Sequence, residues 1–215
     1  MTDIIPIRFS PKFLEKFGNA VADWWNSRWK KTVVVYDTGN GEMKDPRDLL
    51  NAKFEPTPEL QSFLDSIKSL DNDSKAYKIH RWILKDLGMK YKSDSEIWHK
   101  TEYWQTPQQS LSLKSGDCED FSLLWLKIVE IAGIPSYRCK IYCGDTDGGG
   151  HAYPCYLSEE GNRWVSMDLT YYAKILQIEY RAAVQDIRYY GRVWFSFNRS
   201  TIFAQHDTQI ILGDS

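Results

Sequence analysis

The stretch SLKSGDCEDFSLLWLKIVEIAGIP, residues 112–135, decides how the rest of the chain is read. After its cysteine, apolar residues recur at helical spacing: Phe121, Leu124, Trp125, Ile128 and Ala132. Gly133 suits a helix C-cap, and Pro135 prevents the helix from continuing. The pattern predicts a helix that begins at Cys118 or within one residue of it.

The position of Cys118 poses a problem of charge. The N-terminus of a helix stabilises a thiolate through unpaired backbone N–H groups and the helix dipole. However, Asp117, Glu119 and Asp120 surround this cysteine, and their negative charges oppose its ionisation. A nucleophilic Cys118 therefore needs a basic partner elsewhere in the chain.

Helical signals dominate the sequence before this stretch. Apolar and aromatic residues at helical spacing predict a helix over roughly residues 11–30. Asp45 and Thr57 each precede a proline, which is typical of an N-cap followed by the first helical position. A further helix is predicted from near Ser74 to Gly88, and its His80 is interpreted as a structural or surface residue. A short strand, TVVVY, lies at residues 32–36.

Strand signals dominate the sequence after it. Three strands are predicted at residues 137–143, 151–157 and 163–169, then a helix around residues 172–187, then strands at 191–197 and 208–212. Helices come first and a mostly antiparallel sheet follows, so the predicted fold class is α+β.

The composition is that of a globular protein. The chain has 215 residues, of which 42% are hydrophobic and 26% charged, with a formal net charge of -2. Nothing in this balance indicates nucleic acid or an acidic membrane surface as a partner. No signal-peptide core or membrane-length apolar run is present, so we expect a cytoplasmic protein with four reduced cysteines.

A histidine and an aspartate are predicted to meet on the sheet. If the second and third strands form a hairpin in which Leu157 pairs with Asn162, then His151 pairs with Asp168. The carboxylate could then orient the imidazole, whereas a register error of one residue would place them on opposite faces. Together with Cys118 on the helix, these two residues would form a Cys–His–Asp catalytic triad.

At these residues the sequence resembles the transglutaminase-like superfamily, and most closely its bacterial transglutaminase-like cysteine peptidases. The resemblance rests on YKSD, YWQTP, GDCED, GGGHAYPCYL and WVSMDLTYY, in that order between residues 91 and 172. It implies that Cys118, His151 and Asp168 are catalytic, and that the fold is papain-like, with the cysteine helix packed on an antiparallel sheet. Residues 71–215 are then the catalytic domain, and residues 1–70 an N-terminal helical extension packed on it.

The segment upstream of the cysteine contains candidates for a second donor to an oxyanion hole. Trp104, Gln105 and Gln109 carry N–H groups that can donate. Trp104 is favoured because superfamily members often use a tryptophan there, and packing beneath the helix is the alternative.

The chain carries candidate ligands for two metals, zinc and calcium. Cys139 and Cys143 are four residues apart on a strand, about 13 Å, which zinc–sulfur bonds of about 2.3 Å cannot bridge. Calcium is the stronger candidate, because Asp117, Glu119 and Asp120 supply hard oxygen ligands and some related peptidases use calcium beside the cysteine. Capping of the helix by these acids is the alternative. The chemistry itself requires no cofactor.

The sequence therefore predicts a cysteine-dependent amide-bond hydrolase, a peptidase whose substrate is a protein or peptide. Transglutamination or another acyl transfer with the same triad is one alternative. A non-catalytic binding module that kept the fold is the other. The oligomeric state is left open.

Overall fold

The computed structural model describes residues 34–37, 43–160, 163–204 and 210–212. The helix predicted at residues 11–30 lies outside these ranges. The described residues mix helices with sheet, which confirms the α+β class.

The main sheet has five strands, all antiparallel, in the order β7-β6-β5-β8-β9. Their bounds are β5 (Cys139–Thr146), β6 (Gly149–Leu157), β7 (Trp164–Ser166), β8 (Tyr190–Phe197) and β9 (Ile202–Ala204). The first four correspond to strands that the sequence predicts. β5 and β6 contact α7, and each has buried residues in its middle.

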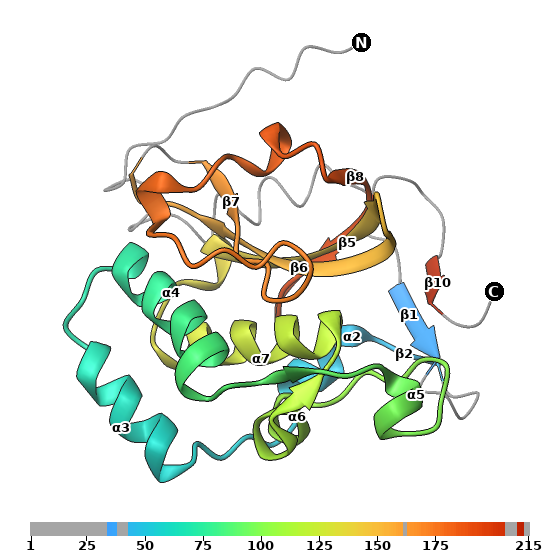
Figure 1. The fold of residues 1–215 in the computed structure, drawn as a ribbon, viewed down its shortest axis with the longest axis horizontal. Helices are drawn as coiled ribbons and strands as arrows, with labels where there is room; N and C mark the ends of the chain where they lie inside the picture. Colours follow the sequence, from blue (N-terminus) through green and yellow to red (C-terminus); the bar gives the residue numbers. More distant parts are fainter. Residues whose placement is uncertain (1–33, 38–42, 161–162, 205–209, 213–215) are drawn as a thin grey trace.

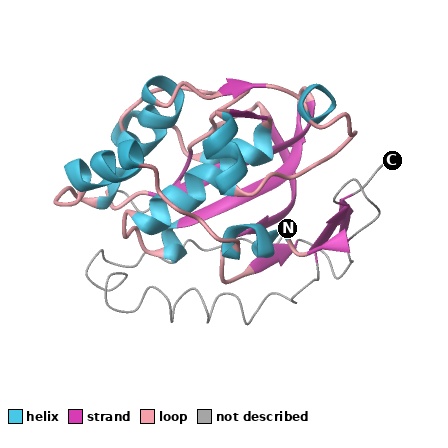
Figure 2. Ribbon diagram, turned by 90° about the horizontal axis from the view of Figure 1, so that it is seen from below, coloured by secondary structure: helices cyan, strands magenta, loops and turns pink. Residues whose placement is uncertain are grey.

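One helix, α7 (Cys118–Ile131), lies between this sheet and the other helices (Figures 1 and 2). It contacts β5 and β6 on one side, and α2, α4 and α6 on others. Every residue from Glu119 to Leu126 is buried, as expected for a helix enclosed on all sides. Ala132 caps its end and Gly133 follows with a φ of 81°, which confirms the predicted termination.

The other α-helices in the described ranges are α2 (Pro46–Asn51), α3 (Pro58–Ile67), α4 (Asn72–Arg81), α5 (Asp94–Ile97) and α6 (Pro107–Leu113). Asp45 and Thr57 cap α2 and α3 by accepting backbone N–H groups, as predicted. α4 begins earlier than predicted, because Asp71 is its N-cap, and a π-helical turn, η1 (Trp82–Asp86), extends it.

Two small sheets complete the arrangement. β3 (Lys90–Tyr91) pairs in parallel with β4 (Ser115–Gly116), immediately before α7. β1 (Val34–Asp37) lies between β2 (Met43–Lys44) and β10 (Ile210–Leu212). β1 and β10 overlap the strands predicted at residues 32–36 and 208–212.

The helix predicted at residues 172–187 is wrong. This segment contains only the short 3-10 turns η3 (Ile178–Tyr180) and η4 (Val184–Asp186), and a third such turn, η2 (Ser136–Arg138), precedes β5. The buried Arg181 explains the difference, because its guanidinium donates to the carbonyl oxygens of Lys174, Leu176 and Ser166. Two of these acceptors, Lys174 and Leu176, lie in the segment itself, so their carbonyl groups are satisfied without a regular helix.

Helices α2 and α3 share one hydrophobic core with α7. Leu50 and Leu60 are fully buried, and they belong to the same cluster as Leu124 of α7. The division at residue 70 into an extension and a catalytic domain stays a prediction.

Candidate active site

The site lies where the first turn of α7 meets the start of β6 and the segment that follows β7. Cys118 is the first residue of α7 and Asp117 is its N-cap. Asp120 accepts the N–H of Asp117 at 3.3 Å and that of Gln105 at 2.7 Å. Any side chain at Gly116 would collide with the Asp120 carboxylate, so the glycine is what allows this close packing.

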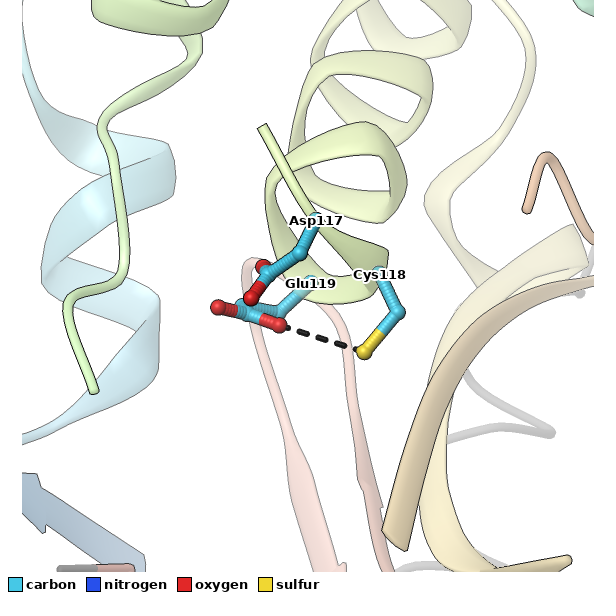
Figure 3. Close-up of side chains that lie close together, drawn as sticks. All are labelled: Asp117, Cys118 and Glu119. Atoms are coloured by element: carbon cyan, nitrogen blue, oxygen red, sulfur yellow. Dashed lines mark hydrogen bonds between the residues drawn. The ribbon is translucent and has the colours of Figure 1, made fainter. Parts of the chain in front are cut away.

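The thiol of Cys118 has two partners. It donates to Oε2 of Glu119 at 3.2 Å, and Sγ accepts the backbone N–H of Ala152 at 3.5 Å. Figure 3 shows the thiol directed toward Glu119, with the Asp117 carboxylate close by. Because Ala152 follows His151 on β6, the second bond places the thiol next to the candidate base.

His151 and Asp168 are in direct contact. Nε2 of His151 lies 2.8 Å from Oδ2 of Asp168, and both side chains are buried. The register used to predict this contact is wrong by two residues, since Leu157 pairs with Trp164 and not with Asn162. Asp168 lies two residues beyond the end of β7, so the contact is made by the segment that follows the strand and not by a strand pair.

This contact defines the tautomer of His151. Burial raises the pKa of Asp168, but the hydrogen bond and charge of His151 outweigh burial and leave that pKa below its usual range. An ionised carboxylate only accepts, so the proton in this contact lies on Nε2 of His151. The other nitrogen, Nδ1, is buried and has no hydrogen-bond partner among the described residues. It is therefore available as a base.

Several groups hold Asp168 in place. Its carboxylate accepts the hydroxyl of Tyr190 at 3.0 Å and the backbone N–H groups of Thr170 and Tyr172 at 2.9 and 3.2 Å. Its backbone carbonyl oxygen lies 2.9 Å from Nε2 of His80. Sequence reasoning missed both Tyr190 and the contact of His80.

A signal for His80 exists in the sequence. The residue is fully buried, as are Ala76, Ile79 and Ile83 on the same face of α4 and η1. A histidine on a helical apolar stripe is expected to be buried, and a buried imidazole needs a polar partner. The partner itself, 88 residues away in the chain, could not be inferred.

The three acids around Cys118 are joined by a fourth, Asp94, the first residue of α5. One oxygen from each of Asp94, Asp117, Glu119 and Asp120 lies within 4.8 Å of the others. Sequence reasoning missed Asp94, although it ends the YKSD motif. The pairing of β3 with β4 is what brings residue 94 beside residue 117.

Three of these four acids have an unsatisfied oxygen. Oδ1 of Asp94, Oδ1 of Asp117 and Oε1 of Glu119 are buried without a hydrogen-bond partner in the part of the chain that the structure describes. Asp120 differs, because both of its oxygens accept N–H groups of Gln105. Asp94, Asp117 and Glu119 are therefore the stronger candidate cation ligands. Asp120 anchors the turn, and its predicted role as a ligand stays a prediction.

Burial raises the pKa values of the acidic groups and of the thiol at this site. Burial raises the pKa of Asp94 to about 7 and that of Glu119 well above its usual range. Burial, together with the negative charge of Asp117, raises the pKa of the Cys118 thiol to about 12. A raised thiol pKa favours the protonated form, which is consistent with the contact from Sγ to Oε2 of Glu119.

The donor set fits calcium better than zinc. Oxygens bound to one Ca²⁺ at about 2.3–2.6 Å lie up to about 5 Å apart, as these oxygens do. Cys139, Cys143 and Cys155 are buried strand residues, and in the described ranges none of them belongs to a cluster of potential ligand atoms.

The three candidate oxyanion donors are all engaged. Nε1 of Trp104 donates to Glu102 at 2.6 Å, the Gln105 amide to Asp120, and the Gln109 amide to Tyr103 at 3.2 Å. The role predicted for Trp104 stays a prediction.

The family model for the transglutaminase-like superfamily matches residues 61–169, just over half of the chain. The chain therefore belongs to the transglutaminase-like superfamily. A comparison with curated proteins finds no significant match. No helix among the described residues is long and apolar enough to cross a membrane.

Solved structures of LapG from Legionella pneumophila share this fold. The calcium-bound structure is 16% identical with a TM-score of 0.57, over 74% of this chain and 86% of LapG. The EGTA-treated structure gives the same identity and TM-score, over 74% of this chain and 83% of LapG. At this identity, the likeness establishes a common fold.

Proposed function

We propose that the chain is a cysteine-dependent amide-bond hydrolase, a peptidase that acts through Cys118, His151 and Asp168. The observation that carries the proposal is the state of His151. Its Nε2 lies 2.8 Å from the Asp168 carboxylate, and its Nδ1 is buried without a hydrogen-bond partner in the part of the chain that the structure describes. The next residue, Ala152, contacts the thiol through its backbone N–H. Membership of the superfamily supports the same assignment.

The reaction proceeds through an acyl-enzyme. Nδ1 of His151 takes the thiol proton, Sγ of Cys118 attacks the amide carbon, and the carbonyl oxygen becomes an oxyanion. The imidazolium returns the proton to the leaving nitrogen, the C–N bond breaks, and a thioester remains on Cys118. His151 then takes a proton from water, the resulting hydroxide attacks the thioester, and the carboxylic acid leaves as the thiol is restored. Asp168 holds the ring and balances its transient charge.

The first turn of α7 supplies the oxyanion donor in this scheme. The backbone N–H of Cys118 is at the start of the helix, where N–H groups have no acceptor within the helix. Trp104 could add a second donor only if its indole N–H left Glu102.

An electrophilic probe tests the triad before any substrate is known. At neutral pH and with calcium present, a peptidyl vinyl sulfone should label Cys118 of the wild type and leave Cys139, Cys143 and Cys155 unmodified. His151→Ala should label far more slowly. Equal rates for the wild type and His151→Ala would contradict a base-activated thiol and favour the binding-module alternative.

The acyl acceptor requires a second measurement. Once a cleaved peptide is identified, mass spectrometry of the products in the presence of a primary amine distinguishes the two alternatives. The hydrolase predicts the free carboxylic acid, whereas an acyl transferase would give the amide of the added amine.

We also propose that the enzyme uses calcium, held by Asp94, Asp117 and Glu119. The three buried, unpartnered carboxylate oxygens support this, and LapG has been solved in a calcium-bound form. A bound Ca²⁺ would offset the negative charge of the carboxylates. It would also bind Glu119, whose carboxylate otherwise accepts a hydrogen bond from the thiol. Probe labelling should therefore fall on addition of EGTA and recover with excess calcium; labelling that EGTA leaves unchanged would contradict the calcium proposal.

A further inference from the structure

Two tyrosines outside the triad meet beside it. The hydroxyl oxygens of Tyr91 and Tyr171 lie 2.7 Å apart, and their ring centroids are 5.6 Å apart. Tyr91 pairs with Gly116 across β3 and β4, and Gly116 is two residues before Cys118 in the chain. The ring of Tyr171 lies 4.8 Å from that of His151. The hydrogen bond thus joins the cysteine side of the site to the histidine side.

The hydroxyl of Tyr91 also lies within electrostatic reach of the nucleophile. Burial and the hydrogen bond to Tyr171 raise the pKa of Tyr91, and the charges of Asp117 and Cys118 add to that effect. We refer to Tyr91 and Tyr171 together as the tyrosine bridge.

The backbone is fixed on both sides of the tyrosine bridge. Lys90 and Lys92 flank Tyr91. Their backbone N–H groups donate to the carbonyl oxygens of Lys114 and Gly116, respectively, at 2.9 Å each. The N–H groups of Thr170 and Tyr172, which flank Tyr171, both donate to the Asp168 carboxylate.

The two rings are nonetheless exposed, at 47% for Tyr91 and 52% for Tyr171. A hydroxyl–hydroxyl bond at such an exposed position competes with water and contributes little net stability. The rings can therefore separate by side-chain rotation, without any change in the backbone that holds the triad.

We propose that the tyrosine bridge spans the opening to Cys118 and must separate when a polypeptide substrate enters. This inference rests on the proposed function, because it assumes that a chain has to reach the thiol. The bridge restricts the site to a substrate segment that can pass between two rings held on fixed backbones. An extended, unfolded segment fits that requirement, whereas the surface of a folded domain does not.

Two alkylating reagents of different size test the bridge. The rate of Cys118 modification is measured with iodoacetamide and with N-(1-pyrenyl)maleimide, by mass spectrometry, at one pH and with calcium present. Both reagents consume the same thiolate, so the ratio of the two rates cancels differences in thiol ionisation. The proteins are the wild type, Tyr91→Phe, Tyr171→Phe, the double variant, and Tyr180→Phe as an exposed control.

Each single variant should raise the maleimide-to-iodoacetamide ratio by about twofold, the low end of what loss of one hydrogen bond gives. The double variant should match the single variants, because either change removes the same bond. Tyr180→Phe should leave the ratio unchanged. The bridge proposal fails, and the proposed function stands, if the ratio is unchanged in the bridge variants. The same holds if the effects of the two single variants multiply in the double variant. A Cys118 that reacts with iodoacetamide no faster than in His151→Ala would overturn the proposed function instead.

Discussion

Nε2 of His80 lies 2.9 Å from the backbone carbonyl oxygen of Asp168, so a helix of the first half of the chain holds the residue that orients the candidate base. Burial and the charge of Arg181 lower the pKa of His80 to about 3. The imidazole is therefore neutral in the folded protein at any pH above that value.

This relationship predicts how stability depends on pH. Between the ordinary histidine value of about 6.5 and the folded value of about 3, the unfolded chain binds a proton at His80 that the folded protein does not. The contribution of His80 is therefore fully present above pH 6.5 and is lost progressively as the pH falls toward 3. His80→Gln should reduce the slope of unfolding free energy against pH in this window by up to about 1.4 kcal/mol per pH unit. Urea unfolding at pH 7.5, 6.0, 5.0 and 4.5 measures it, and parallel curves for the two proteins would contradict the assignment.

Asp168→Asn should impair the candidate base without unfolding the site. The amide can still accept through its oxygen, but it can also present N–H groups and so favour the wrong tautomer of His151. We expect the rate of Cys118 labelling to fall by about a hundredfold, with the melting temperature changed far less than activity. A labelling rate within twofold of the wild type would remove Asp168 from the proposed mechanism.

Asp94→Asn and Glu119→Gln should each weaken calcium binding by at least about tenfold, because each removes a negative oxygen ligand. Asp147→Asn, an exposed carboxylate outside the cluster, is the matched control. Isothermal titration calorimetry of the full chain measures the affinity. Equal affinities for the three variants would place the calcium site elsewhere.

Gly116→Ala should destabilise the fold by about 1–3 kcal/mol, because its new methyl group would overlap the Asp120 carboxylate that anchors α7. Gly148→Ala is the control, since a methyl group there makes only ordinary contacts of 3.6 Å or more. Thermal unfolding compares the two. A Gly116→Ala protein as stable as Gly148→Ala would show that the close packing at Asp120 is not required.

The sequence predicts the parts of this site that depend on local pattern. The start of α7 at Cys118 follows from apolar spacing and the cap at Asp117. The contact of His151 with Asp168 is predicted from strand pairing, although Asp168 itself lies beyond the end of β7. Local signals also place the N-caps at Asp45 and Thr57.

The parts that it does not predict depend on contacts between distant segments. Asp94 joins the acidic cluster only because two-residue strands pair across a separation of 25 residues in the chain, Lys90 with Ser115. Arg181 replaces a predicted helix with an irregular segment, and nothing in its immediate neighbours indicates that it would be buried. Such residues carry no periodic signal, so only the folded structure reveals them.

The hydrogen bond from Cys118 to Glu119 has a chemical consequence for the lifetime of the protein. A thiolate attacks peroxides and disulfides far faster than a thiol does. While Glu119 holds the proton on sulfur, the nucleophile is stored in the form that resists oxidation to sulfenic acid and mixed disulfides. The Glu119 carboxylate therefore both restrains the reactivity of Cys118 in the resting state and protects the thiol from oxidation.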